Sequence, residues 1–455
     1  MKKVVKPYHF SQMKSLADFS RTMGADGLDF PVSENLDILN QPYTLYGKTV
    51  PNRMGIQPLE GFDGLPNGAP SDLIFRRYHR YAAGGSGLIW YESIAISDDG
   101  RCNPLQMVIN DETVPEIKRL IQESNAAAAQ AMGSHHIPYN IVQLTHSGRR
   151  STNKNWEPTP LAATRNPYMD DHNAIDGRSG PLEVATDEKI EEIVEGFIHG
   201  AELSAEAGFD AVDVKVCHEY ILRELLSAFT RPGKYGGSFE NRTRALFDII
   251  DGIRKRVGDG IEICVRLNAY DCVPYPYGWG MVKEEGVMRP DLTEPIQLCR
   301  MLTERGVKLI NLSTMMPRYR PYGAGLMAEH DEHDITPYAG VFDLLKATRD
   351  IKAQVPDGIF MCTGLTWLEQ FGANVGAGGI EQGWFDIAGF GRQAFAYPDY
   401  ARDIISGKGM QRNKCCITCD KCYDLIQIGH TTTGCVVRDQ EVYLPLYRSK
   451  VQKKG

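Results

Sequence analysis

Eight short apolar runs alternate with helical patterns along this chain, and this alternation constrains the fold more than any other feature. The runs cover residues 53–59, 87–94, 139–145, 211–216, 261–267, 308–313, 359–363 and 386–390. Each has the length and apolar content of a buried strand. Strands that alternate with helices form parallel βαβ units, and eight repeats favour a closed barrel over an open sheet. The sequence therefore predicts an α/β fold, a (β/α)8 TIM barrel.

The stretches between the runs are amphipathic, with apolar residues every three or four positions over 186–207 and 239–257. Thr186 with the acidic residues that follow it is typical of a helix start. A barrel absorbs most of the 455 residues. We expect an N-terminal extension over residues 1–40, the barrel over 41–410, and a cysteine-bearing segment with a tail over 411–455.

The net charge of −8 and the lack of a long basic run give no support for a nucleic-acid partner. No apolar stretch approaches the ~18 residues of a membrane helix, and no apolar segment follows the basic start. We therefore expect a cytoplasmic protein without a membrane partner. The sequence leaves an oligomer open.

In a barrel, the chemistry lies at the carboxyl ends of the strands. This rule selects the candidate functional residues, which are 58–61, 92, 143–146, 215–220, 266–271, 314–322, 364 and 391–392. The long connections at 147–185 and 270–294 are typical of substrate lids or specificity loops.

The 11 cysteines are unevenly distributed, with six scattered singly and five between residues 415 and 435. Cys416, Cys419, Cys422 and Cys435 have two, two and twelve residues between them. Four thiolates so close together suit a [4Fe–4S] cluster, and a structural zinc site is the alternative. Cys415 is left over and is not expected to be a ligand.

Several collinear segments resemble the old yellow enzyme family. They include Gln143-Leu144-Thr145-His146-Ser147-Gly148-Arg149, His218-Glu219-Tyr220, Tyr235-Gly236-Gly237-Ser238-Phe239-Glu240-Asn241-Arg242 and Gly389-Phe390-Gly391-Arg392. The matches run from about residue 43 to 437. They are most similar to the iron–sulfur branch, represented by 2,4-dienoyl-CoA reductase and trimethylamine dehydrogenase, but the chain has no match to the nucleotide-binding domains of those enzymes.

The resemblance implies an FMN site. It places Gln143 at the pyrimidine edge, Arg266 beside N1, and Gly364, Gly391 and Arg392 around the phosphate. These roles suit the residue types, because glycine lets backbone amides approach phosphate and arginine offers a bidentate fork.

Pro58, Glu60 and Glu92 complete the expected cofactor site as strand-end residues. Glu60 stands where trimethylamine dehydrogenase has the cysteine that bonds to its flavin. Because glutamate cannot form that thioether, we expect non-covalent FMN.

The resemblance assigns catalysis to Lys215, His218 and Tyr220. Lys215 and His218 would hold a substrate carbonyl oxygen, and Tyr220 would protonate carbon. Lys215 replaces the usual histidine and would repel an alkylammonium substrate. No histidine aligns in the loop that carries Arg318, Tyr319, Arg320 and Tyr322, so the proton donor is Tyr220 alone; the arginines there meet an anionic substrate or belong to a solvated loop.

The implied function is an ene-reductase that acts on an α,β-unsaturated carbonyl or carboxyl compound. Electrons would enter through the cluster from a separate electron-transfer flavoprotein or reductase, with NADH as a direct or indirect donor. Two alternatives stay open: an amine dehydrogenase of the trimethylamine dehydrogenase type, and an electron-transfer subunit of a larger complex.

Overall fold

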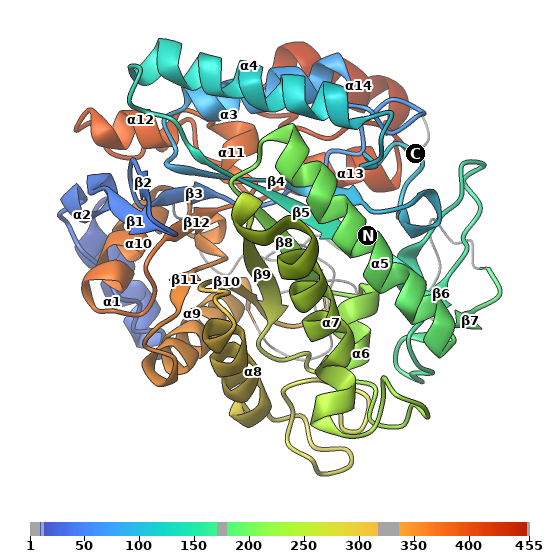
Figure 1. Ribbon diagram of the computed structural model, residues 1–455. Coiled ribbons are helices and arrows are strands. Elements are labelled where there is room, and N and C mark those ends of the chain that lie inside the picture. Colours follow the sequence, from blue (N-terminus) through green and yellow to red (C-terminus); the bar gives the residue numbers. More distant parts are fainter. Residues whose placement is uncertain (1–9, 11–12, 171–179, 317–335, 453–455) are drawn as a thin grey trace.

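The computed structural model describes residues 10, 13–170, 180–316 and 336–452. Its centre is an eight-stranded parallel sheet, and all eight predicted runs contribute to it (Figure 1). The strands, in spatial order, are β11 (Ile359–Met361), β10 (Leu309–Ser313), β9 (Glu262–Asn268), β8 (Ala211–Val216), β5 (Tyr139–Thr145), β4 (Leu88–Ala95), β3 (Met54–Ile56) and β12 (Ala388–Phe390). A parallel bridge between Met361 and Ile387 joins the two ends, so the sheet closes into the predicted barrel.

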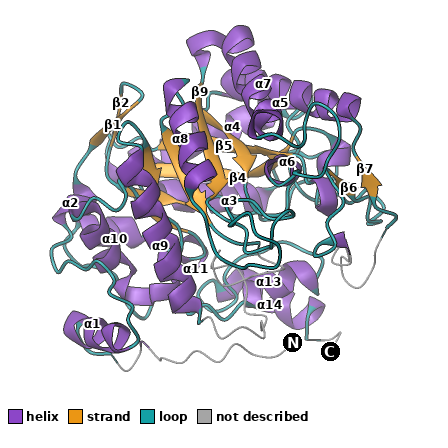
Figure 2. Cartoon of the chain, turned by 90° about the horizontal axis from the view of Figure 1, so that it is seen from below, coloured by secondary structure: helices purple, strands orange, loops and turns teal. Residues whose placement is uncertain are grey.

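Helices surround the barrel as the strand–helix alternation predicts (Figure 2). The outer helices are α3 (Asp72–Ala83), α4 (Val114–Met132), α5 (Asp187–Ala207), α7 (Phe239–Val257), α8 (Thr293–Glu304), α9 (Pro337–Gln354) and α10 (Gly372–Glu381). The Thr186 hydroxyl accepts a hydrogen bond from the Lys189 amide at 3.2 Å, which confirms the expected start of α5. None of the helices in the described ranges has the length and apolar character of a membrane span.

A short hairpin closes one end of the barrel. Its antiparallel strands are β1 (Tyr43–Leu45) and β2 (Lys48–Val50). Leu45 and Val50 are buried against Leu88, Trp90 and Leu309 near the amino ends of the barrel strands. Because this end is filled with apolar side chains, the opposite end is left for a ligand.

The segment before the barrel packs on its side. It contains α1 (Leu16–Ala25) and α2 (Asp37–Asn40). Phe19 of α1 is fully buried, and its ring stacks on that of Phe371 with centroids 4.8 Å apart.

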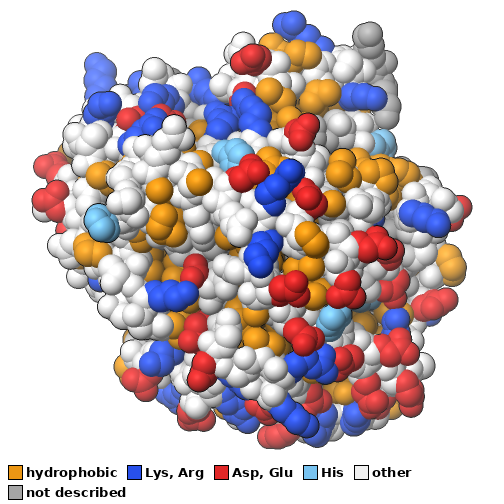
Figure 3. Space-filling view, turned by 45° about the horizontal axis from the view of Figure 1, so that its top comes forward, with side chains coloured by type: hydrophobic (Ala, Val, Ile, Leu, Met, Phe, Trp, Pro, Cys, Tyr) orange, Lys and Arg blue, Asp and Glu red, His pale blue; other side chains and the backbone are white. Residues whose placement is uncertain are grey.

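Further helices follow two of the barrel strands, β8 and β12. They are α6 (Ile221–Leu226), which follows β8, then α11 (Gln393–Ala396), α12 (Tyr400–Ile405), α13 (Lys421–Gln427) and α14 (Gln440–Lys450). α13 and α14 lie beside α3 in Figure 1, so the cysteine-bearing segment packs against the barrel. On the face shown in Figure 3, side chains of both charge signs are interspersed.

Candidate active site

A deep cavity opens at the carboxyl ends of the barrel strands, and we call it the mouth cavity. It holds about 1640 Å³ of space including its open entrance. A cavity at the mouth of a barrel with a few convergent polar side chains is a common position for a ligand site. The predicted site residues that line it are Pro58, Glu60, Gln143, Lys215, His218, Tyr220, Arg266, Gly364, Gly391 and Arg392.

Glu60 joins two of the predicted catalytic side chains. Its Oε1 accepts hydrogen bonds from Lys215 Nζ and from the Tyr220 hydroxyl, each at 2.9 Å. Lys215 Nζ also lies 3.6 Å from the centre of the Tyr220 ring. Sequence position alone does not connect Glu60 with either residue, because Glu60 follows β3, whereas Lys215 lies in β8 and Tyr220 follows that strand.

Charge and burial oppose each other at Glu60 but act in the same direction at Tyr220. Burial alone would raise the pKa of Glu60, but the Lys215 ammonium and the hydrogen bonds from Lys215 and Tyr220 lower it below its usual value. Burial and the Glu60 charge raise the pKa of Tyr220 well above its usual value. Glu60 is therefore ionised and Tyr220 is protonated at neutral pH.

His218 occupies a left-handed backbone conformation, with φ of 62°. Such conformations are uncommon outside glycine and concentrate at functional sites. Arg223 Nε donates to the His218 carbonyl oxygen at 2.5 Å, and the ring Nε2 lies 3.2 Å from Ser313 Oγ. Burial and the nearby arginine and lysine charges lower the pKa of His218 well below its usual value, so the ring is neutral.

Gln143 is held in one orientation by its neighbours on the barrel wall. Its Oε1 accepts from Ser93 Oγ at 2.8 Å, and its Nε2 donates to Asp213 Oδ2 at 2.6 Å. The same Asp213 oxygen accepts from Trp90 Nε1 at 2.9 Å. Burial raises the pKa of Asp213 to about 6, and these hydrogen bonds oppose the rise.

Arg266 is a buried cation that, among the described residues, is close enough to the Asp213 carboxyl to lower the pKa of that group. Its Nε is buried without a hydrogen bond, and its side chain forms no ion pair there. A buried charge is costly unless it is paired. An anionic group in the mouth cavity would supply the missing partner, which fits the reduced flavin expected beside Arg266.

At the phosphate end of the predicted flavin site, the backbone conformation, a hydrogen bond and an ion pair hold the residues in place. Gly364 has φ of 102°, which glycine alone adopts readily, and the Gly391 amide donates to Thr366 Oγ1 at 3.2 Å. Arg392 lines the mouth cavity but forms an ion pair with Asp420. Its guanidinium is therefore already engaged by the cysteine-bearing segment.

Glu92, which the sequence predicts at the cofactor site, does not line the mouth cavity. It is buried beneath the cavity, where its Oε1 lies 2.9 Å from Arg77 Nη1 and its Oε2 accepts from the Gly61 amide at 3.0 Å. The register shift between Tyr91 and Ser93 in β4 changes the direction of the side chains here. Strand position alone could not reveal that shift.

The four cysteines of the predicted cluster line one small cavity of about 360 Å³, which we call the cysteine cavity. Cys419 is exposed, and burial raises the pKa of Cys416 to about 11 while the Arg392 charge opposes the rise. Among the described residues, no three His, Cys, Asp or Glu side chains are arranged to hold a metal ion. The cluster therefore stays a prediction.

The mouth cavity and the cysteine cavity share a wall. Arg392, Phe395 and Cys422 line both of them. The side chains of Tyr423, Ile426 and Gln427 in and around α13 also line the mouth cavity, and the Trp156 and His430 rings lie 5.5 Å apart. The cysteine-bearing segment thus forms part of the site, which its sequence spacing did not predict.

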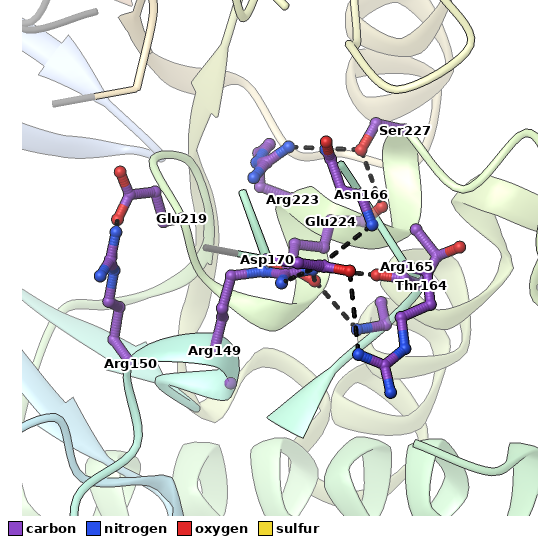
Figure 4. Close-up of polar contacts among 12 residues, drawn as sticks. Arg149, Arg150, Thr164, Arg165, Asn166, Asp170, Glu219, Arg223, Glu224 and Ser227 are labelled. Atoms are coloured by element: carbon purple, nitrogen blue, oxygen red, sulfur yellow. Dashed lines mark hydrogen bonds and ion pairs between the residues drawn. The ribbon is translucent and has the colours of Figure 1, made fainter. Parts of the chain in front are cut away.

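The loop after β5 contributes to the site, as its length and composition predicted. Arg150 of this loop lines the mouth cavity and is ion-paired with Glu219 (Figure 4). The neighbouring Arg149 fixes the loop, since its Nη1 lies 2.6 Å from Asp170 Oδ1 and its Nε lies 2.8 Å from Glu224 Oε1. The expected contribution of Arg318, Tyr319, Arg320 and Tyr322 lies outside the described residues.

The sequence is similar to those of known proteins. Residues 38–284 match the model of the NADH:flavin oxidoreductase / NADH oxidase family. A NADPH dehydrogenase of Listeria monocytogenes is 32% identical over 280 residues, which are 60% of this chain and 72% of that protein.

Two solved structures share the fold. A 2-naphthoyl-CoA reductase complex has a TM-score of 0.72 at 23% identity, with 89% of this chain and 57% of that chain covered. Histamine dehydrogenase from a Rhizobium species has a TM-score of 0.67 at 19% identity, with 89% and 53% covered. The chain thus spans little more than half the length of either. Together, the family match and the site show that the chain belongs to the NADH:flavin oxidoreductase / NADH oxidase family and is a flavin-dependent oxidoreductase.

Proposed function

We propose that the protein is an FMN-dependent ene-reductase that reduces the C=C bond of an α,β-unsaturated carbonyl or carboxyl compound. The observation that carries this proposal is the position of Lys215, His218 and Tyr220, which line the same cavity as Gln143 and Arg266. Two oxygen-binding groups and one acid therefore stand beside the residues that suit a flavin.

Gln143, Arg266, Gly364 and Gly391 would hold FMN, which supplies hydride to the substrate when it is bound and reduced. The neutral His218 ring and the Lys215 ammonium would bind the substrate oxygen and stabilise the negative charge that develops on it. Tyr220 would then donate a proton to the α carbon. Phenylacrylates, steroid enones and enoyl-CoAs all contain the required group.

We also propose that the chain belongs to the iron–sulfur branch of the family. The spacing of the four cysteines and the cavity that they share support a [4Fe–4S] cluster. A structural zinc bound by the same four thiolates is the alternative, and the metal content of the purified protein distinguishes the two. A cluster there would pass single electrons between the flavin and a separate electron-transfer protein, with NADH or NADPH as the ultimate source.

Amine dehydrogenation is a second candidate, because Glu60 neutralises Lys215. The sequence suggested that the Lys215 charge would repel an alkylammonium ion. In the structure the two side chains form an ion pair at 2.9 Å, so that repulsion is largely cancelled. The cysteine at which trimethylamine dehydrogenase binds its flavin is still replaced by Glu60.

One anaerobic experiment separates these functions. We expect 2-cyclohexenone, cinnamate or cinnamoyl-CoA to reoxidise the dithionite-reduced flavin, and trimethylamine, dimethylamine and histamine to leave the oxidised flavin unchanged. Reduction by an amine would establish the second candidate instead. A flavin that responds to no member of either panel would favour an electron-transfer subunit.

A further inference from the structure

A continuous chain of hydrogen bonds connects the proposed acid with the proposed flavin contact. It starts at the Tyr220 hydroxyl, passes through Glu60 Oε1 to Lys215 Nζ, and continues at 2.7 Å to Ser93 Oγ. Ser93 in turn donates to Gln143. The central oxygen of Glu60 is the one atom shared by Lys215 and Tyr220.

The surroundings of Tyr220 disfavour the phenolate that remains after its hydroxyl has donated a proton. A phenolate formed there would lie beside the Glu60 carboxylate in a buried site, and burial together with that charge raises the pKa of Tyr220 well above normal. The Cys102 and Cys217 thiols also lie close enough to influence it, and the nearest arginine charges, those of Arg266 and Arg223, act on His218. The Lys215 ammonium is the cation closest to the shared oxygen.

We propose that Glu60 is a positioning residue that returns a proton from Lys215 to Tyr220 after each turnover. This inference rests on the proposed ene-reductase function. The substrate β carbon gains the hydride, which brings both electrons, and the α carbon gains a proton from Tyr220. Tyr220 regains a proton through Glu60, Lys215 loses one, and solvent restores it, so the net reaction consumes one solvent proton.

A merely structural role for Glu60 makes a different prediction. If Glu60 only anchored Lys215 or the flavin, its loss would act independently of Tyr220. If Glu60 acts through Tyr220, its loss has no further effect once the Tyr220 hydroxyl has been removed. A double-mutant cycle distinguishes these cases.

The test uses full-length holoenzyme that carries Glu60→Gln, Tyr220→Phe or both substitutions. Dithionite-reduced protein is mixed with 2-cyclohexenone or cinnamate, and flavin reoxidation is followed by stopped flow. We expect Glu60→Gln to slow reoxidation about 10- to 100-fold and Tyr220→Phe ~10²–10⁴-fold. The double variant should be within about twofold of Tyr220→Phe alone.

Two further measurements distinguish a proton relay from a structural role of Glu60. Small buffer acids such as formic acid and imidazolium should accelerate Glu60→Gln but not the wild type, because only the variant lacks its internal proton source. Glu60→Asp retains the carboxylate and should recover part of the rate, and FMN content shows that each variant is folded.

Two outcomes would overturn the relay but not the proposed function. In one, the rate losses of the two single variants multiply in the double variant; in the other, buffer acids do not accelerate reoxidation in Glu60→Gln. Failure of every acceptor to reoxidise the wild type would overturn the proposed function and the relay with it.

Discussion

At the residue scale, the surroundings of Arg266 favour a role in ligand binding over a role in stabilising the fold. Arg266 is a buried arginine that lines the mouth cavity and forms no ion pair among the described residues, whereas the fully buried Arg223 is ion-paired with Asp271 at 3.0 Å. The Arg266 guanidinium is therefore placed to pair with an anionic ligand in the mouth cavity. The effect of the Arg266 charge on the stability of the apoprotein and its effect on FMN affinity can be measured separately.

We expect Arg266→Gln to weaken FMN binding about 10- to 100-fold, because hydrogen bonds to charged groups contribute ~1.5–3 kcal/mol. The thermal stability of the apoprotein should stay constant or rise, since an unpaired buried charge is removed. Fluorescence titration with FMN and calorimetry of the apoprotein measure the two effects. Arg223→Gln is the control and should lower apoprotein stability, because it leaves Asp271 unpaired. Unchanged FMN affinity in Arg266→Gln would contradict the assignment.

Tyr220→Phe tests the proposed acid. It should slow reoxidation of the reduced flavin by an alkene substrate ~10²–10⁴-fold and leave flavin reduction unaffected. The two half-reactions are measured separately by anaerobic stopped flow. Reoxidation at the wild-type rate would mean that another group or solvent supplies the proton.

At the scale of elements, α3 connects the barrel with the cysteine-bearing segment through two adjacent arginines. Arg77 is buried and ion-paired with Asp63 and Glu92, and its Nη2 donates to the Thr433 carbonyl oxygen at 3.3 Å. Arg76 is paired with Asp439 at 2.8 Å, but its side chain is 34% exposed. The buried contacts hold the loop after β3, which carries Glu60, against the segment that carries Cys435.

The two arginines should therefore differ in their contribution to stability. Arg77→Met leaves two carboxylates buried without their cation and should cost ~3–5 kcal/mol. Arg76→Met breaks a partly exposed pair and should cost less than about 1 kcal/mol. Urea denaturation followed by circular dichroism compares them. Equal midpoints for both variants would contradict a structural role for the buried network.

The cysteine-bearing segment offers a similar matched pair. Cys419→Ala should abolish iron binding, whereas Cys415→Ala should retain about four irons per chain, because Cys415 does not line the cysteine cavity. Iron and acid-labile sulfide are measured after anaerobic purification. Zinc in the wild type, or iron retained by Cys419→Ala, would contradict the proposed cluster.

At the scale of the whole molecule, the positions of the two cavities suggest a route for electrons from a partner protein to the flavin. The cysteine cavity reaches the surface at the exposed Cys419 and shares its inner wall with the mouth cavity. We expect NADH or NADPH alone to reduce the flavin slowly, and an electron-transfer protein to reduce it fast. Stopped-flow absorbance of the wild type measures both rates. Fast reduction by a nicotinamide alone would show that the donor docks directly over the flavin.

The sequence by itself determined the barrel and the central side chains of its mouth. Apolar periodicity depends on neighbouring residues, so the eight barrel strands and long helices such as α5 and α7 could be located from local pattern alone. The rule that chemistry lies at the carboxyl ends of the strands then selected Gln143, Lys215, Tyr220 and Arg266 without any coordinates. Their types and order carried the resemblance that the family match confirms.

Only the tertiary structure decided which of these residues meet. Glu60 and Tyr220 are 160 residues apart in the chain, yet one oxygen of Glu60 binds both Tyr220 and Lys215. Glu92 is ion-paired with Arg77 and does not line the mouth cavity, and Arg392 is ion-paired with Asp420. Side-chain partners across a closed barrel depend on strand register and on the packing of distant segments, and neither leaves a periodic signal in the sequence.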